Sequence, residues 1–156
     1  MTTTVPDGDG CTIRQATRAD LLAVFRIEKQ SFPQPWPYAA FEGFLDEPGF
    51  LVAETDEGVA GYVVADTVPN GGRSLGHVKD IAVHPEMRGL GLGRRLLDRA
   101  LDAMRAQRAS RVKLEVRESN EPALSLYREF GFRRQRTLPR YYDDGEDAYV
   151  LVRSLG

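Results

Sequence analysis

The chain has 156 residues, a formal net charge of −2 and hydrophobic residues at 42% of its positions, which is typical of one globular domain in water. The small net charge argues against a general polyanion-binding protein, so we expect no nucleic-acid partner. No apolar run approaches the ~20 residues of a membrane helix, and the single cysteine, Cys11, cannot form an internal disulfide. We therefore predict a flexible tail over residues 1–10 and one domain over residues 11–156, in a cytoplasmic protein without an export signal or membrane partner.

In the first half of the chain, the pattern predicts four strands and two helices. A first helix begins at the capping-box sequence Thr17-Arg18-Ala19-Asp20 and ends before the prolines of residues 33–37. A short second helix follows around Phe41, and a glycine-bearing loop is expected over residues 68–76. The expected strands are short apolar runs bounded by turn residues: 12–16, 50–54, 59–66 and 78–83.

The second half predicts two helices and three strands. A long amphipathic helix starts at Leu92, and a second helix covers residues 121–130 with Pro122 in its first turn. The expected strands are the clean alternation of 111–117 and the runs 133–138 and 148–153. Together the elements predict an α/β fold, with a mixed sheet of six or seven strands and about four helices.

The turn between the fourth strand and the long helix is rich in glycine: Arg88-Gly89-Leu90-Gly91-Leu92-Gly93-Arg94. Glycines at the start of a helix leave its first N–H groups accessible, and these groups attract a phosphate or pyrophosphate. Arg94 occupies the last glycine place of a dinucleotide-binding motif, and no P-loop ending is present. A phosphate site and a merely flexible turn both remain open at this point.

Three segments in this order resemble one family, the GCN5-related N-acetyltransferases (GNAT family). They are the strand and glycine turn of residues 81–93, Leu114-Glu115-Val116-Arg117 with Ser119-Asn120, and Ala123-Leu124-Ser125-Leu126-Tyr127 with Gly131-Phe132. Phe32-Pro33, Pro35-Trp36 and the Tyr141-Tyr142 loop resemble a narrower branch, the ribosomal-protein-alanine and archaeal amino-terminal acetyltransferases. The resemblance covers nearly everything from residue 12 to residue 152. It implies a sheet splayed between the fourth and fifth strands.

The resemblance also implies acetyl-CoA as cosubstrate and no metal. In the family, the pyrophosphate lies on backbone N–H groups of the glycine turn, the pantetheine arm pairs with the preceding strand, and Asn120 contacts that arm. Asn120 is equally suited to cap the following helix. The implied cofactor-binding residues are Ile81, Ala82, Val83, Arg88, Gly89, Leu90, Gly91, Leu92, Gly93, Arg94, Asn120 and Tyr127.

Glu115 and Tyr127 are the candidate catalytic residues. The resemblance gives Tyr127 the role of proton donor to the leaving thiolate, although a core aromatic would show the same spacing. Glu115 is the candidate base, and its structural alternative is a strand residue paired with Lys113 or Arg117. At pH 7.5 about a third of an α-amine is neutral, against roughly a thousandth of lysine, so a carboxylate base suits an amino terminus better.

The branch places substrate contacts at Phe32, Pro33, Trp36, Tyr141 and Tyr142. The two tyrosines could instead be an aromatic pair that packs the hairpin, and the acidic run over residues 143–147 could be a solvated turn. Some amino-terminal acetyltransferases carry a glutamate where this chain has Gln34, which shifts the role of base onto Glu115. Neither His77 nor His84 has metal-ligand spacing.

We therefore predict direct acetyl transfer from acetyl-CoA to the α-amine of a protein amino terminus, with ribosomal proteins among the candidate acceptors, by a monomer or weak dimer. Transfer to lysine, a polyamine or a free amino acid keeps the same chemistry. A non-catalytic acyl-CoA-sensing module is an alternative from another class, but it has no use for Glu115 and Tyr127. A nucleotide-binding regulatory domain is a third possibility, which the missing nucleotide motifs disfavour.

Overall fold

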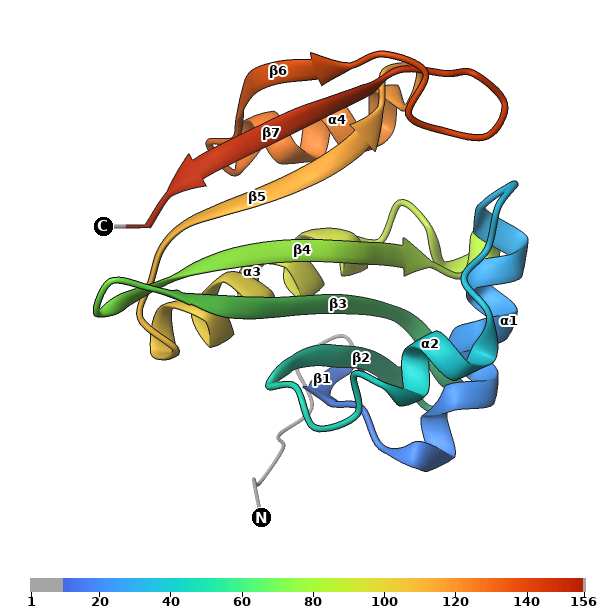
Figure 1. Ribbon diagram of the computed structural model, residues 1–156. Helices are drawn as coiled ribbons and strands as arrows, with labels where there is room; N and C mark the ends of the chain where they lie inside the picture. The colour runs from blue at the N-terminus through green and yellow to red at the C-terminus, as the bar shows by residue number, and fades with distance from the viewer. Residues whose placement is uncertain (1–9, 156) are drawn as a thin grey trace.

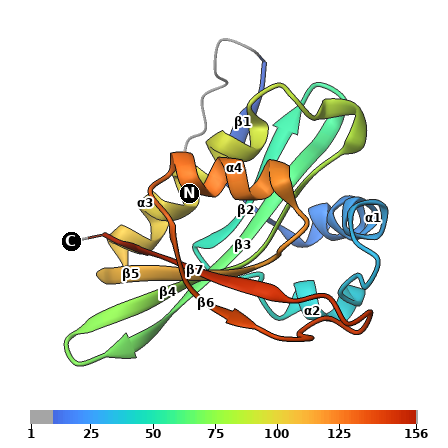
Figure 2. The ribbon, with the colours of Figure 1, turned by 90° about the horizontal axis from the view of Figure 1, so that it is seen from above.

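The structure is a computed structural model that describes residues 10–155, so the predicted tail lies, apart from Gly10, outside the described residues. Seven strands form one sheet in the order β1-β2-β3-β4-β5-β7-β6. Figure 1 shows α3 and α4 behind this sheet and α2 in front of it, and Figure 2 shows the same division from above. The strands are β1 (Thr12–Gln15), β2 (Gly49–Thr55), β3 (Gly58–Asn70), β4 (Arg73–Val83), β5 (Ala109–Arg117), β6 (Arg133–Leu138) and β7 (Ala148–Ser154). The α-helices are α1 (Leu21–Ser31), α2 (Tyr38–Glu42), α3 (Leu92–Ala106) and α4 (Glu121–Glu129), with short 3-10 turns at Arg18–Asp20 and Pro85–Met87.

Each face of the sheet carries its own apolar core. Behind the sheet, the apolar stripe predicted for α3 is buried, and α4 adds Leu124 and Tyr127 to the same cluster. In front of it, α1 and α2 pack on β2 and β3 through a second cluster that contains Phe41, Phe50 and Tyr62. No helix within residues 10–155 is long and apolar enough to cross a bilayer.

The sheet opens between β4 and β5, as the sequence predicted. These two strands are parallel and pair only from Ser74 with Ala109 to His77 with Lys113. Beyond that point β4 continues to Val83 and β5 to Arg117 without pairing to each other, whereas β5 stays paired with β7 from Arg111 to Arg117. One edge of β4 is therefore left without a strand partner where the two strands separate.

One element differs from the sequence prediction. Residues 68–76, expected as a loop, belong to a long β3–β4 hairpin whose register runs on to Asn70 with Arg73. Gly71 and Gly72 adopt positive φ angles of 59° and 85° and make the tight turn that the hairpin needs. Local turn residues such as Pro69 and Asn70 suggested a loop, but pairing between the two strands overrode that local signal.

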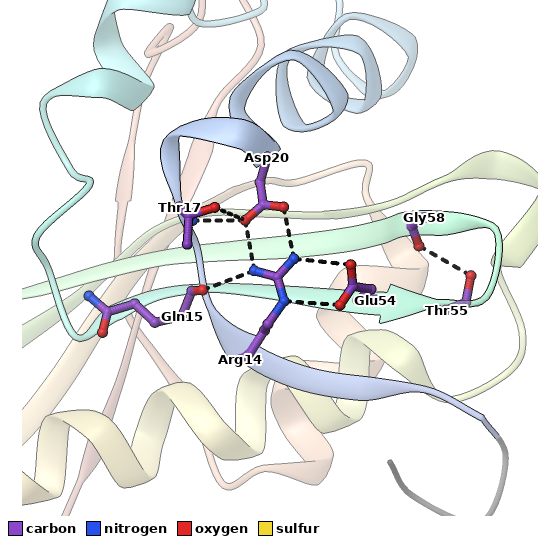
Figure 3. Close-up of polar contacts among 7 residues, drawn as sticks. All are labelled: Arg14, Gln15, Thr17, Asp20, Glu54, Thr55 and Gly58. Carbon is purple, nitrogen blue, oxygen red and sulfur yellow. Dashed lines mark hydrogen bonds and ion pairs between the residues drawn. The ribbon is translucent and has the colours of Figure 1, made fainter. Parts of the chain in front are cut away.

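A polar cluster fixes the first strand to the rest of the molecule (Figure 3). Arg14 on β1 donates to Asp20 at 2.8 and 2.9 Å and to Glu54 on β2 at 3.1 and 3.2 Å. Asp20 also accepts the backbone N–H of Thr17 at 2.8 Å, which completes the predicted capping box. We call Arg14, Thr17, Asp20 and Glu54 the Arg14 cluster.

Candidate active site

A cavity of about 660 Å³ lies where β4 and β5 separate. Its walls come from five parts of the chain that are far apart in the sequence: the α1–α2 connection, the second half of β4, the glycine turn, the end of β5 with α4, and the β6–β7 loop. We call it the central cavity. The predicted site residues that line it are Phe32, Pro33, Trp36, Ile81, Ala82, Val83, Arg88, Gly93, Glu115, Asn120, Tyr127 and Tyr142.

The glycine turn presents the N-terminus of α3 beside this cavity. Gly91 is the N-cap residue and has a φ angle of +82°, a conformation that favours glycine, and it supplies no side chain to cap the helix. A Cβ atom added at Gly91 would meet nothing, so its glycine is required by conformation and not by crowding. Arg88 ties the turn to β4, because its Nε donates to the Val83 carbonyl at 3.0 Å. The first N–H groups of α3 therefore fit an anionic phosphate group.

Five predicted cofactor residues lie outside the lining of the central cavity: Gly89, Leu90, Gly91, Leu92 and Arg94. Leu92 is buried in the core behind the sheet, and Leu90 is 61% exposed. The Arg94 side chain forms an ion pair with Glu129 on α4. In this turn only backbone groups are placed for a phosphate, so the side chains of Leu90, Leu92 and Arg94 carry no specific contact to the cavity.

The free edge of β4 offers backbone groups to the cavity. His84 N–H bonds to Ala60 of β3 at 2.7 Å, and in a strand successive N–H groups point to opposite sides. The N–H groups of Val83 and Ile81 therefore point away from β3, towards the gap between β4 and β5. This edge suits both an extended ligand arm and a carbonyl oxygen that gains negative charge.

Glu115 meets a partner that sequence analysis missed. Its Oε1 lies 2.8 Å from Nε2 of His77 on β4, and its Oε2 lies 3.7 Å from the ammonium of Lys113. Burial by itself raises the pKa of Glu115, but the hydrogen bond and charge of His77 and the charge of Lys113 outweigh it and hold that pKa below its usual value. The expected pairing with Lys113 is thus present, whereas Arg117 binds elsewhere. No spacing in the sequence links His77 with Glu115, because they meet only through the parallel pairing of β4 with β5.

Tyr127 is buried on α4 and contacts Phe132 edge-to-face, with ring centroids 5.8 Å apart. It is therefore both a core aromatic and a residue of the cavity wall. Burial, with smaller contributions from Asp80 and Tyr142, raises the pKa of the Tyr127 phenol well above its usual value. The phenol keeps its proton at neutral pH and is available as a donor. Asn120 caps α4, since its Oδ1 accepts the Ala123 N–H at 3.3 Å, and the residue also lines the cavity.

The substrate-side wall is held together by polar contacts between two loops. Gln34 Oε1 accepts the Asp143 N–H at 3.1 Å and a guanidinium N–H of Arg117 at 3.2 Å. Arg117 also bonds to Asp144 and Glu146 at 2.8 Å each, and its guanidinium lies 4.0 Å from the ring centre of Tyr142. The acidic run is therefore not simply a solvated turn, because Asp144 and Glu146 bind Arg117.

A second pocket of about 360 Å³ adjoins the first on the side of α2. Trp36 and Glu115 line both pockets, and Tyr141 lines only the second. Trp36 packs against Phe41 and Phe44 with ring centroids 5.2 and 5.7 Å apart. The rings of Tyr141 and Tyr142 lie edge-to-face with centroids 5.0 Å apart, and each tyrosine lines one of the two pockets. The two pockets together form a passage from the glycine turn to the front of the molecule.

Sequence analysis also missed a group of acids under this passage. Glu28 on α1 is 2% exposed, and its Oε1 accepts the hydroxyl of Tyr62 on β3. The Tyr62 hydroxyl also lies 3.5 Å from Oδ2 of Asp80 on β4. Burial and the Glu28 carboxyl raise the pKa of Asp80 well above its usual value. Glu28 and Asp80 both line the central cavity.

Comparisons with known proteins fit this geometry. The acetyltransferase (GNAT) family model matches residues 21–132. The chain is 39% identical over 155 residues to an N-alpha-acetyltransferase of Sulfolobus acidocaldarius, with 92% of each protein covered. The crystal structure of Ard1 from Thermoplasma volcanium has a TM-score of 0.87 and 29% identity, covering 94% of this chain and 99% of that one.

Two further structures share the fold. The ribosomal-protein-S18-alanine N-acetyltransferase of Escherichia coli has a TM-score of 0.82 and 27% identity, with 94% of each chain covered. YncA of Salmonella typhimurium shares the fold with a TM-score of 0.79, at 24% identity and over 94% of this chain and 95% of that one, and its structure contains acetyl-CoA. The predicted family, fold and class of enzyme are confirmed. The chain belongs to the GNAT family and is an N-acetyltransferase.

Proposed function

We propose that this enzyme transfers the acetyl group of acetyl-CoA to the α-amino group of protein N-termini. The observation that carries the proposal is the passage through the splayed sheet, with a phosphate-binding helix terminus at one end and a loop-walled pocket at the other. The Nα-acetyltransferases among its relatives support the same acceptor.

Acetyl-CoA fits the rear of the passage. The α3 N-terminus would hold its pyrophosphate, and the free edge of β4 from Ile81 to Val83 would pair with its extended arm. The thioester would then lie between the Val83 N–H and the Tyr127 phenol. The N–H stabilises negative charge on the acetyl oxygen, and the phenol protonates the departing sulfur.

The acceptor amine enters from the front pocket, where Glu115 lies at the junction of the two pockets. An α-ammonium has to lose a proton before it attacks, and Glu115 with His77 forms a unit that accepts it. Because its pKa is held low, Glu115 stays ionised at neutral pH and acts as a mild base. This unit suits an α-amine, whose pKa is about 7.7–8.0, better than a lysine at about 10.4.

The front pocket suits an extended peptide. Trp36 and Tyr141 form its walls, and Tyr142 closes the central cavity. A ribosomal protein in the cytoplasm is one acceptor of this kind, because the Escherichia coli relative acts on ribosomal protein S18.

The direct test is acetyl transfer from labelled acetyl-CoA to matched short peptides, one with a free and one with a blocked amino terminus, each with an internal lysine. We expect label only on the α-amine of the free peptide, located by mass spectrometry. Comparable labelling of the internal lysine in the blocked peptide would assign the enzyme to lysine acetylation.

A further inference from the structure

Two carboxyl groups meet beneath the central cavity without a cation. Glu28 comes from α1 and Asp80 from β4, and Tyr62 lies between them. Among the described residues no ion pair involves either acid; the nearby ammonium of Lys79 lies 3.8 Å from Asp66 instead. Two adjacent carboxyl groups in such a place repel each other when both are ionised, so this arrangement stabilises a proton on one of them.

The hydrogen bonds indicate which acid keeps that proton. Glu28 accepts the Tyr62 hydroxyl at Oε1 and the backbone N–H of Trp36 at Oε2, the latter at 2.9 Å. Both of its oxygens therefore act as acceptors, as expected of a carboxylate. The proton falls to Asp80, in agreement with the direction in which burial and Glu28 move the pKa of Asp80.

Asp80 is also placed where a proton is useful. It lines the central cavity together with Ala82 and Val83, which follow it on β4, and with Tyr127 on the opposite wall. Because both residues line the same cavity, water within it can connect the carboxyl group of Asp80 with the Tyr127 phenol. A phenol with a raised pKa leaves behind a costly phenolate when it gives up its proton, unless a neighbouring acid supplies another.

We propose that Asp80 is a second acid of the acyl-transfer site, kept protonated by Glu28 and serving Tyr127. The inference rests on the proposed function. As the acceptor nitrogen bonds to the acetyl carbon, the carbon–sulfur bond breaks and its electron pair goes to sulfur. Tyr127 gives its phenol proton to sulfur, Asp80 resupplies a proton to the Tyr127 oxygen through water in the cavity, and the nitrogen returns one proton to Asp80 by the same route. One proton has then moved from nitrogen to sulfur, and the enzyme is unchanged.

The surroundings of Asp80 define what a pH measurement reports. Glu28 faces it from α1, Tyr62 from β3 and Tyr127 from α4. Across the cavity lie the ionisable groups of β5 and the β6–β7 loop: Glu115, Arg117 and Tyr142. Of these groups, Glu28 is the acid that raises the pKa of Asp80, so removing its charge should lower that pKa.

The test compares Asp80→Asn, Glu28→Gln and the matched control Asp66→Asn in the full chain, with a free-terminus peptide and acetyl-CoA. We expect Asp80→Asn to lower kcat roughly 10- to 100-fold, within or just below the range for a positioned acid, with little change in acetyl-CoA Kd or peptide KM. Glu28→Gln removes the negative charge beside Asp80, so the alkaline fall in kcat should move to lower pH. Asp66 lies outside both pockets, so Asp66→Asn should change neither kcat nor the pH at which kcat falls on the alkaline side.

A folded Asp80→Asn protein with normal kcat and a normal alkaline limb would overturn the proposal. If Asp80→Asn does not fold, the pH profile of Glu28→Gln is the deciding measurement. An alkaline fall in kcat at the same pH as in the wild-type enzyme would then overturn the proposal. Failure of the proposed function looks different, because the wild-type enzyme itself would then leave free N-termini unmodified.

Discussion

The Arg14 cluster and the Glu28–Tyr62–Asp80 group both join a helical segment to the sheet through carboxyl groups. They differ in that only the first contains a cation that pairs with those carboxyl groups. In the first, one guanidinium binds Asp20 and Glu54, and these bonds outweigh burial and hold the pKa of Asp20 below its usual value (Figure 3). In the second, no cation is present among the described residues, and the pKa of Asp80 is raised. The cluster that contains a cation lies outside the lining of the cavity, whereas Glu28 and Asp80 line it, so we assign stability to the first group and chemistry to the second.

The largest expected effect concerns the cofactor end of the passage. Gly91→Glu should abolish measurable acetyl-CoA binding, because a carboxylate at the N-terminus of α3 repels the pyrophosphate. Isothermal titration calorimetry measures this, and Gly91→Asn is the control, since asparagine tolerates a positive φ angle and adds no charge. Unchanged affinity in folded Gly91→Glu would remove the cofactor assignment.

The second-largest expected effect is the loss of turnover when either candidate catalytic residue is replaced. Glu115→Gln and Tyr127→Phe should each reduce kcat by roughly 10²–10⁴-fold with little change in acetyl-CoA affinity, as for a positioned acid or base. Steady-state kinetics and thermal melts decide the matter together. A large drop in Tm with near-normal turnover would place these residues with the Arg14 cluster, as structural groups.

Changes at the acceptor end of the passage should raise the KM for the peptide. Replacing Tyr141 and Tyr142 with alanine should raise the peptide KM about 10-fold while acetyl-CoA binding is kept, since both tyrosines lie on the pocket walls away from the glycine turn. The control is Tyr38→Ala, because Tyr38 is partly exposed on α2 and lies outside both pockets. Equal KM values for the double variant and this control would remove the tyrosines from substrate binding.

Arg14→Met should separate stability from chemistry. It leaves the buried Asp20 without its cation, which should lower the free energy of unfolding by about 1–3 kcal/mol. Because the cluster lies outside both pockets, kcat should stay near the wild-type value. Urea titration and kinetics on the same sample test this, and a matched loss of kcat would contradict the division drawn above.

The smallest effect is a difference in pH dependence. The lowered pKa of Asp20 contributes stability that is present at neutral pH and lost as the pH falls through its folded value. The raised pKa of Asp80 acts in the opposite sense, so stability falls as the pH rises from about 4 to its folded value. Asp20→Asn should therefore destabilise the protein at pH 7 more than at pH 3, whereas Asp80→Asn should relatively stabilise it at higher pH. Parallel urea titrations at several pH values would contradict this if both variants changed in the same direction.

The sequence determined the features whose chemistry is local. Glycines before an amphipathic run predict an accessible helix N-terminus, and strict alternation predicts β5, because backbone conformation and the burial of one face act over a few neighbouring residues. Spacing along α4 similarly brought Asn120 and Tyr127 to one side. The family resemblance then supplied the splayed sheet and the roles of Glu115 and Tyr127.

Only the tertiary structure decided which distant side chains meet. His77 reaches Glu115 through parallel strand pairing, and Glu28, Tyr62 and Asp80 come from three elements whose sequence patterns give no sign of one another. Gln34, read in the sequence as a missing base, instead joins two loops across the passage. The pKa of a carboxyl group depends on the charges and the water around it, and those surroundings exist only once the chain has folded.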